Sequence, residues 1–184
     1  MNIEQTILPG LKIIEPRIFA DDRGYFFESY NQQKFSDQGI DITFVQDNQS
    51  KSSYGVIRGL HYQLNPKAQT KLVRVLQGTI FDVAVDIRKG SPTFLQWFGI
   101  ELSEENKKQL LIPQGFAHGF SVLSETAVVM YKCDNLYAPE LERGIIYNDA
   151  DLKIDWQIEP TKAIVSGKDK QNPVANEAET NFSF

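Results

Sequence analysis

Hydrophobic and polar residues alternate along much of this chain with a period of two. The clearest run is KLVRVLQGTIFDVAVDIR, residues 71–88. Because neighbouring side chains of a β-strand point to opposite faces, this alternation indicates two strands rather than a helix. In the second strand one face carries Phe81, Val83, Val85 and Ile87, and the other carries Ile80, Asp82, Ala84 and Asp86. Gly78 separates the two strands and predicts a hairpin turn between them.

The same short-strand pattern recurs elsewhere, with Gly, Pro, Asn and Asp between most of the strands. Helical patterns are weak: residues 31–39, which end at Gly39, and residues 103–109, with Ser103 as N-cap, each predict one short helix. Many short strands at close intervals are typical of a sandwich, barrel or jelly roll. The further predicted strands lie at residues 10–19, 24–30, 44–50, 96–102, 109–115, 117–124, 127–133 and 144–149.

Length and composition narrow the class of protein. We expect residues 1–184 to form one domain with a substantial core, with a peripheral tail from about residue 172. A net charge of −5 argues against a nucleic-acid partner, because such proteins need a basic surface. The single cysteine, Cys133, excludes an intrachain disulfide. No run of about 18 apolar residues occurs, so we expect no membrane association and a cytoplasmic protein.

The chain has only two histidines, and the first lies in the strand VIRGLHYQ, residues 56–63. On a regular strand His61 shares a face with Gly59 and Ile57, whereas Arg58 points the other way. An imidazole directed into a β-barrel has a tunable pKa and can act as a base. A single histidine in a strand is more often structural, and for His61 alone we prefer that interpretation by about two to one.

The second histidine, His118, follows Pro113 and Gly115 in IPQGFAHGF. This spacing matches the second half-motif of the cupin superfamily, small jelly rolls in which the histidine is often a metal ligand. A cupin metal centre needs further histidines after Gly78, and GTIFDVAVDIR contains none. Zinc and iron sites usually use three or more His, Cys or carboxylate ligands, so two histidines argue against a tight transition-metal site. A site that adds carboxylates, as in a metal-dependent cupin oxygenase, stays open, but we expect no metal and no other cofactor.

Three further residues place ionisable side chains in apolar strands. Lys71 shares a face with Val73 and Val75, so its ammonium is either positioned for function or extends to the rim. A buried Asp82 would need a partner, and a histidine is a natural one. Tyr131 lies in AVVMYKC and would bring a phenol into the same cavity, although packing alone is the simpler explanation.

Taken together and in order, five segments resemble the dTDP-4-dehydrorhamnose 3,5-epimerase family from about Thr6 to Asp169. They are RGLHYQ, LVRVLQGTIFDVAVDIR, IPQGFAHGF, MYKCDNLYAPELERGIIYND and SGKD. The resemblance implies an all-β, cupin-like jelly roll (a double-stranded β-helix) with a few short peripheral helices. It also implies a metal-independent isomerase and a homodimer, in which N-terminal strands are candidates for exchange. The implied substrate is a dTDP-sugar, inverted at C3 and C5 through an enolate in dTDP-L-rhamnose biosynthesis.

The resemblance also implies roles for individual side chains. His61 corresponds to the general base, Tyr131 to the general acid, and Asp169 to the carboxylate that orients His61. Lys71 corresponds to the cation beside the sugar ketone, where one good donor typically stabilises the enolate by about 3–4 kcal/mol. The implied substrate-binding residues are Arg23, Glu28, Gln46, Asp47, Asn48, Arg58, Lys71, Asp82, His118, Glu142 and Lys168.

Two local features need an explanation within this resemblance. Arg58 and His61 lie on opposite faces of a regular strand, yet both are implied at the ligand. We expect either a bulge at Gly59 that turns Arg58 to the cavity mouth, or an Arg58 that reaches the neighbouring subunit. Gly167 replaces the glutamate usual in the family, and we expect it to loosen the loop that carries Asp169.

Other functions remain open at the level of sequence. Close relatives with the same fold would invert only C5 or only C3, or would be ketoisomerases of a related nucleotide sugar. A non-catalytic nucleotide-sugar-binding cupin is a further alternative, although such a protein would be expected to lose the acid or the base.

Overall fold

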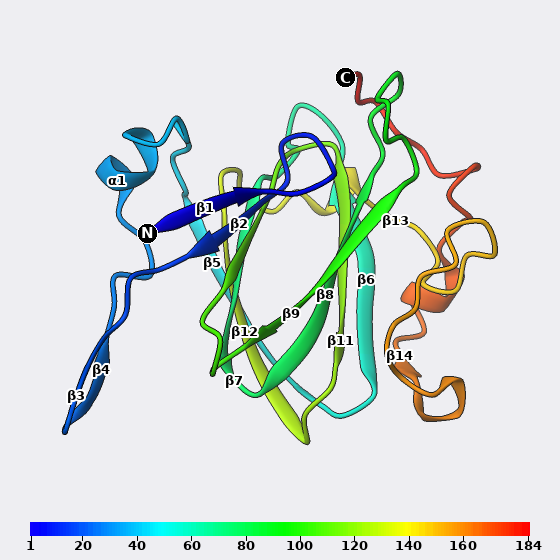
Figure 1. Cartoon of the computed structure of the whole chain (residues 1–184). Helices are drawn as coiled ribbons and strands as arrows, with labels where there is room; N and C mark the ends of the chain where they lie inside the picture. Colours follow the sequence, from blue (N-terminus) through cyan, green and yellow to red (C-terminus); the bar gives the residue numbers. More distant parts are fainter.

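The computed structural model describes residues 1–184 and contains two sheets that face each other (Figure 1). It is the all-β, cupin-like jelly roll expected from the sequence. The first sheet, in spatial order, consists of β1 (Asn2–Gln5), β2 (Lys12–Glu15), β10 (Gln109–Ile112), β7 (Lys71–Gln77), β12 (Thr126–Cys133) and β5 (Gln46–Ser53). The second consists of β13 (Glu142–Gly144), β6 (Val56–Gln63), β11 (Phe116–Val122), β8 (Thr79–Asp86) and β9 (Trp97–Ser103), with β14 (Ile164–Val165) parallel to β6. The other elements are β3 (Phe19–Asp21), β4 (Gly24–Phe26), α1 (Gln32–Ser36) and three 3-10 turns, η1 (Pro139–Leu141), η2 (Pro160–Lys162) and η3 (Asp169–Gln171).

Both faces of β8 are buried, and the alternation of its side chains separates two hydrophobic clusters. Ile80 and Ala84 lie between the sheets, in one cluster with Val73 of β7. Val83 and Val85 belong to a second cluster on the outer face of the sheet. The predicted assignment of these residues to opposite faces is therefore confirmed, and it explains why β8 is so apolar.

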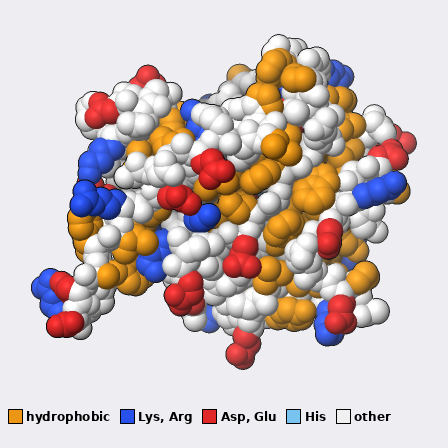
Figure 2. All heavy atoms as spheres, viewed as in Figure 1, with side chains coloured by type: hydrophobic (Ala, Val, Ile, Leu, Met, Phe, Trp, Pro, Cys, Tyr) orange, Lys and Arg blue, Asp and Glu red, His pale blue; other side chains and the backbone are white.

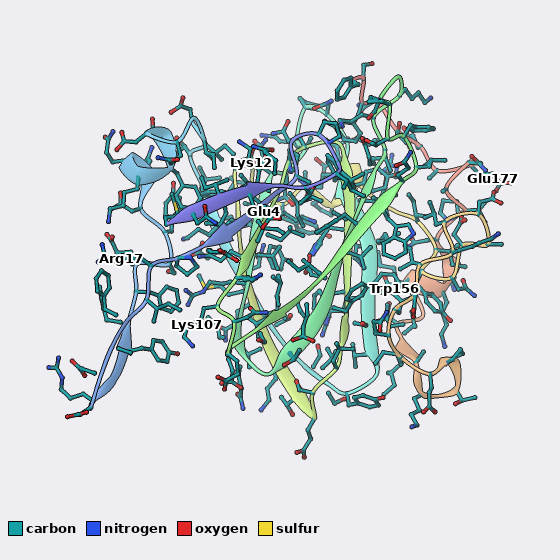
Figure 3. The ribbon with its side chains drawn as sticks, viewed as in Figure 1. Glu4, Lys12, Arg17, Lys107, Trp156 and Glu177 are labelled. Atoms are coloured by element: carbon teal, nitrogen blue, oxygen red, sulfur yellow. The ribbon has the colours of Figure 1, made fainter.

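The C-terminal segment covers the outer face of the second sheet. Figure 3 shows Trp156 between the β6 side of the barrel and this segment. Its indole Nε1 donates to Tyr147 O at 2.7 Å, and Ser121 Oγ donates to Trp156 O at 2.5 Å. The peripheral tail is also attached, because Phe182 is buried in the outer cluster and Phe184 N–H donates to Lys89 O at 3.1 Å.

The helix predicted within residues 31–39 is confirmed as α1. Asn31 caps it, since its side chain accepts a hydrogen bond from Lys34 N–H at 3.1 Å. Phe35 and Ile40 pack on Leu72 at the outer face of the first sheet. No helix in the structure is long and apolar enough to span a membrane.

Gly78 passes the chain from one sheet to the other, so the predicted hairpin between β7 and β8 is wrong. β7 pairs with β10 and β12, whereas β8 pairs with β9 and β11. Gly78 has a φ of 77°, and a Cβ there would lie 2.1 Å from Thr126 O. A glycine therefore indicates the sharp turn correctly, but it does not specify which strands pair after it.

Residues 103–109 form a turn that leads into β10 and not the predicted helix. Ser103 N–H donates to Asn106 Oδ1 at 3.1 Å, and Asn106 N–H donates to Ser103 Oγ at 3.0 Å. Such local side-chain bonds compete with helical ones, and Lys107 has a φ of 54°. The strand predicted at residues 144–149 is also wrong, because β13 ends at Gly144.

β3 and β4 form a two-stranded arm that projects from the barrel (Figures 1 and 2). Figure 3 places Arg17 near the base of the arm, where its guanidinium lies 4.8 Å from the Phe19 ring centroid. Phe19, Tyr25 and Phe26 are 51, 59 and 65% exposed. Isolated two-stranded ribbons are marginally stable, and clustered exposed aromatic side chains are typical of a contact surface.

Asp86, at the end of β8, fixes the corner that follows. It accepts hydrogen bonds from Arg88 Nε at 2.8 Å, Ser91 Oγ at 2.6 Å and Thr93 Oγ1 at 2.8 Å. Burial alone would raise the pKa of Asp86, but these hydrogen bonds lower it below its usual value. The ionised carboxylate therefore stabilises the fold above its unfolded-state pKa of about 3.9, and this contribution is lost as the pH falls through the lower folded-state pKa.

We predict that Asp86→Asn lowers the free energy of unfolding by about 3–5 kcal/mol at pH 7, because Arg88 is left without its charged partner. Denaturant titrations across the acid range measure the difference, which should shrink once the wild-type carboxylate is protonated. Asp22→Asn, at the exposed arm, is the control and should change stability by less than about 0.5 kcal/mol. A loss for Asp86→Asn that is the same at every pH would contradict the electrostatic explanation.

Candidate active site

A cavity of about 700 Å³ opens between the two sheets. Strands β6 and β11 contribute to it from the second sheet, and β5, β7 and β12 from the first. The structure therefore brings most of the predicted site residues together. Those that line the cavity are Gln46, Asn48, Arg58, His61, Lys71, His118, Tyr131, Glu142, Lys168 and Asp169.

A β-bulge at Gly59 directs both Arg58 and His61 into this cavity. Between the facing pairs His61–His118 and Arg58–Phe120, two residues of β6 stand opposite one residue of β11. Gly59 has a φ of 122°, and a Cβ there would lie 2.6 Å from a backbone carbon of β11. The expected bulge at Gly59, which turns Arg58 towards the cavity, is thus confirmed.

His61 is held by Asp169. Its Nε2 lies 3.1 Å from Asp169 Oδ1, and Gly59 N–H donates to the other carboxylate oxygen at 3.4 Å. Burial alone would raise the pKa of Asp169, but its hydrogen bond with His61 lowers it below the usual range. An ionised Asp169 accepts a hydrogen bond from Nε2–H, which leaves the lone pair of a neutral imidazole on Nδ1.

The loop that carries Asp169 is fixed by its own hydrogen bonds. Asp169 N–H donates to Ser166 Oγ at 3.0 Å, and Lys170 N–H donates to Ser166 O at 3.1 Å. No atom lies within 4 Å of where a Cβ on Gly167 would be. The loop therefore places Asp169 against His61 with a glycine at this position.

Glu142 lies near the other imidazole nitrogen. Its Oε1 is 3.7 Å from His61 Nδ1, and its Oε2 accepts hydrogen bonds from Lys168 Nζ at 2.6 Å and Tyr137 Oη at 2.7 Å. Burial alone would raise the pKa of Glu142, but its hydrogen bonds with Lys168 and Tyr137 lower it. His61 therefore has a carboxylate near each ring nitrogen.

Tyr131 and Lys71 form the opposite wall, on neighbouring strands of the first sheet. Lys71 Nζ lies 5.9 Å from the Tyr131 ring centroid and 3.5 Å from His61 O, and it forms no ion pair with a carboxylate. Burial lowers the pKa of Lys71 and raises the pKa of Tyr131. Cys133 faces Lys71 across the strands, and burial raises the pKa of its thiol to about 11, so it stays neutral.

His118 and Asp82 form the predicted pair. His118 Nε2 lies 2.9 Å from Asp82 Oδ2, and the His118 ring centroid lies 6.5 Å from that of Tyr131. His118 lines the cavity, whereas Asp82 is fully buried behind it. Asp82 therefore does not reach the cavity and instead orients the imidazole.

Besides Asp82, three predicted binding residues lie outside the cavity of their own chain. Arg23 is on the arm and pairs with Asp21. Glu28, just beyond the arm, pairs with Lys34. Asp47 Oδ1 accepts a hydrogen bond from Lys132 Nζ at 3.0 Å across the β5–β12 pair. Their predicted binding role would require another chain or a rearrangement.

Sequence reasoning missed some residues of the cavity, among them Tyr137 and Gln63. Gln63 Nε2 donates to Lys67 O at 2.6 Å, and its Oε1 accepts from Ala138 N–H at 2.8 Å. Gln63 follows His61 by two residues, so the alternation of β6 was a usable signal. Tyr137 precedes a 3-10 turn and lies in no strand, so no alternation of residues indicates that it faces the cavity.

No group of three or more His, Cys, Asp and Glu side chains is arranged to hold a metal ion. Each histidine instead faces carboxylates of its own surroundings. Metal independence of any reaction at this site stays a prediction, and activity after chelation would test it.

Comparisons with known proteins agree with the resemblance seen in the sequence. The family model for dTDP-4-dehydrorhamnose 3,5-epimerase matches residues 5–177. The chain is 54% identical to such an epimerase from Shigella flexneri, over 92% of this chain and 93% of that one. It is 53% identical to one from Pseudomonas aeruginosa, over 97% and 98%. A Legionella pneumophila dTDP-6-deoxy-D-glucose-3,5-epimerase, solved with dTDP-4-keto-L-rhamnose, aligns with a TM-score of 0.92 and 52% identity over 96% and 93% of the chains.

We predict opposite outcomes for two glycine substitutions at the site. Gly59→Ala should lower the free energy of unfolding by at least about 2 kcal/mol, because the new Cβ meets backbone and the φ is unfavourable. At Gly167 a new Cβ would have no neighbouring atom within 4 Å. Gly167→Ala should therefore raise the free energy of unfolding by about 0.4–1 kcal/mol, because it restricts the unfolded chain. Denaturant unfolding of both variants checks this, and similar stability of the two would mean that the Gly59 bulge is not required.

Proposed function

The chain belongs to the dTDP-4-dehydrorhamnose 3,5-epimerase family, and we propose that His61 and Tyr131 perform the proton transfers of that reaction. The chain is an isomerase of dTDP-rhamnose biosynthesis that inverts C3 and C5 of dTDP-4-dehydro-6-deoxy-D-glucose. One observation carries the proposal: the two side chains line a single cavity from different sheets.

The reaction needs groups on two opposite walls. C3 and C5 of the sugar flank the C4 ketone, so their hydrogens are weakly acidic. Inversion removes a proton from one face of the carbon and returns one to the other face, which a single side chain cannot easily do. His61 of β6 and Tyr131 of β12 lie on facing sheets and so supply a base and an acid for the two faces.

Asp169 makes His61 suitable as the base. It accepts a hydrogen bond from Nε2–H and so leaves Nδ1 free to take the proton from the sugar. Its negative charge then stabilises the imidazolium that forms. The lowered pKa of Asp169 keeps it ionised at neutral pH.

Lys71 and Tyr131 suit the other half of the chemistry. Removing either proton gives an enolate with its charge on the former ketone oxygen. Lys71 is buried and has no carboxylate partner, so its ammonium is available to that oxygen, with a contribution of about 3–4 kcal/mol. The raised pKa of Tyr131 keeps its phenol protonated until it donates to the carbon.

Polar residues at the rim of the cavity suit the dTDP part of the substrate. Arg58 Nε donates to Ser52 Oγ at 3.0 Å, and the guanidinium forms no ion pair within the chain. It is therefore free to bind a diphosphate with two parallel hydrogen bonds. Gln46, Asn48 and Lys168 also lie at the cavity and offer hydrogen-bond donors.

We propose that the protein is a homodimer in which the arm reaches the cavity of the partner. The arm exposes three aromatic side chains and carries Arg23 away from the cavity of its own chain. Docking it on a second barrel would bury these side chains and would bring Arg23 and Glu28 to a substrate. Each chain would act as one domain, and we place the enzyme in the cytoplasm.

Isotope exchange tests the catalytic roles. With the 4-keto substrate in deuterated water, the protein should introduce deuterium at C3 and at C5, with or without a metal chelator. His61→Asn should slow exchange, and Tyr131→Phe should slow inversion, each by about 10²–10⁴-fold, and Tyr54→Phe, which lies outside the cavity, should change neither. Exchange at one carbon alone would indicate a single-carbon epimerase, and none at either carbon would contradict an enzyme.

Subunit mixing tests the exchanged arm. Arg23→Ala should lower activity by roughly 10- to 100-fold, the loss expected for one charged hydrogen-bonding group. Mixed dimers of Arg23→Ala and His61→Asn should regain activity, because one cavity then has both an intact His61 and an intact arm. Mixtures of His61→Asn with Asp169→Asn are the control and should stay inactive. Failure of the first mixture to recover would contradict arm exchange.

A further inference from the structure

His61 lies between two cavities, of which the substrate would fill only one. A side cavity of about 150 Å³ shares His61, Glu142 and Lys168 with the main cavity. Asn172 and Glu179 also line it. The side chains of Lys168 and Glu179 are 63 and 62% exposed, so this cavity borders solvent, and it is large enough for several water molecules.

We propose that Glu142 and the side cavity form the route by which His61 releases each proton to solvent while the sugar stays bound. The proposal rests on the role of His61 as base. It gives Glu142 a proton-transfer function beyond contact with the substrate, and it gives the side cavity a function of its own.

The double inversion requires such a route. In a ring of the D-gluco configuration the hydrogens at C3 and C5 lie on the same face, so one base must remove both. After the first removal His61 is an imidazolium and cannot act again until it loses that proton. A bound nucleotide sugar occupies the main cavity in front of His61 and excludes water from it.

Glu142 is placed to accept the proton. Its Oε1 lies 3.7 Å from His61 Nδ1, a gap closed by a small side-chain rotation or bridged by one water molecule. The N–H bond of the imidazolium breaks as the carboxylate O–H bond forms, and the carboxylic acid then protonates a water molecule of the side cavity. For each inversion Tyr131 gives one proton to the sugar and regains one from solvent when the cavity opens, so the protein carries no net charge after the full cycle.

Two features favour transfer beyond Glu142. Hydrogen bonds with Lys168 and Tyr137 oppose the effect of burial and lower the pKa of Glu142, so a proton that it receives is passed on. Asn172 Nδ2 is buried and has no hydrogen-bond partner in the protein, although its side chain lines the side cavity. It is thus a donor available to water on the exit side.

The test measures how much sugar is released after one inversion and how much is released after two. During turnover in deuterated water, the ratio of singly to doubly deuterated sugar released should rise about tenfold or more for Glu142→Gln. Weaker binding of the once-inverted sugar also raises this ratio, and rescue by a buffer base separates that cause from blocked proton release. Glu140→Gln, from the preceding turn and outside both cavities, is the matched control and should keep the wild-type ratio.

A second variant and a rescue distinguish proton release from binding. Asn172→Leu, nearly the same size, should also raise the ratio because it makes the side cavity less polar. Increasing concentrations of imidazole buffer should lower the ratio of Glu142→Gln towards the wild-type value. Wild-type ratios in both variants, or a Glu142→Gln ratio insensitive to buffer, would overturn the proposal. Absence of any exchange by the unaltered protein would instead overturn the proposed function itself.

Discussion

The bulge at Gly59 is the constraint on which the rest of the site depends. A regular β6 would turn either Arg58 or His61 away from the interior, because adjacent strand positions alternate between faces. The extra residue in β6 lets both line one cavity. Only glycine fits there, since the backbone of β11 passes too close for a side chain. The same position also provides the N–H that donates to Asp169, so one local irregularity aligns the base and its orienting carboxylate.

Around this bulge, most charged side chains of the interior lie next to a partner of opposite charge. Asp169 and Asp82 each hold one of the two histidines, and Glu142 is neutralised by Lys168. Lys71 is the exception, because it is buried without a carboxylate. Burying an unpaired cation is costly, so its retention agrees with a role towards an anion that forms only during the reaction. The protein is acidic overall, yet two cations without an ion-pair partner, Arg58 and Lys71, line the cavity.

Features that depend on neighbouring residues in the sequence could be predicted, whereas features that depend on distant residues could not. The faces of β8 followed from alternation, because that pattern is a property of a single strand. The hairpin at Gly78 did not form, because pairing is decided by distant strands. The site was assembled from the family resemblance, and no local signal found Tyr137. The resemblance named Arg23 as a binding residue, but Arg23 lies outside the cavity of its own chain, and strand periodicity carries no signal for that position.

The central claim is that Asp169 fixes the tautomer of His61 so that Nδ1 is the base. Nitrogen NMR of protein labelled with ¹⁵N-histidine measures this directly, and the chain has only two histidines, so a His118→Gln variant assigns the signals. In the neutral imidazole we predict that His61 carries its proton on Nε2 and none on Nδ1, and that Asp169→Asn removes this preference. A proton on Nδ1 with a bare Nε2 in the unaltered protein would contradict the account.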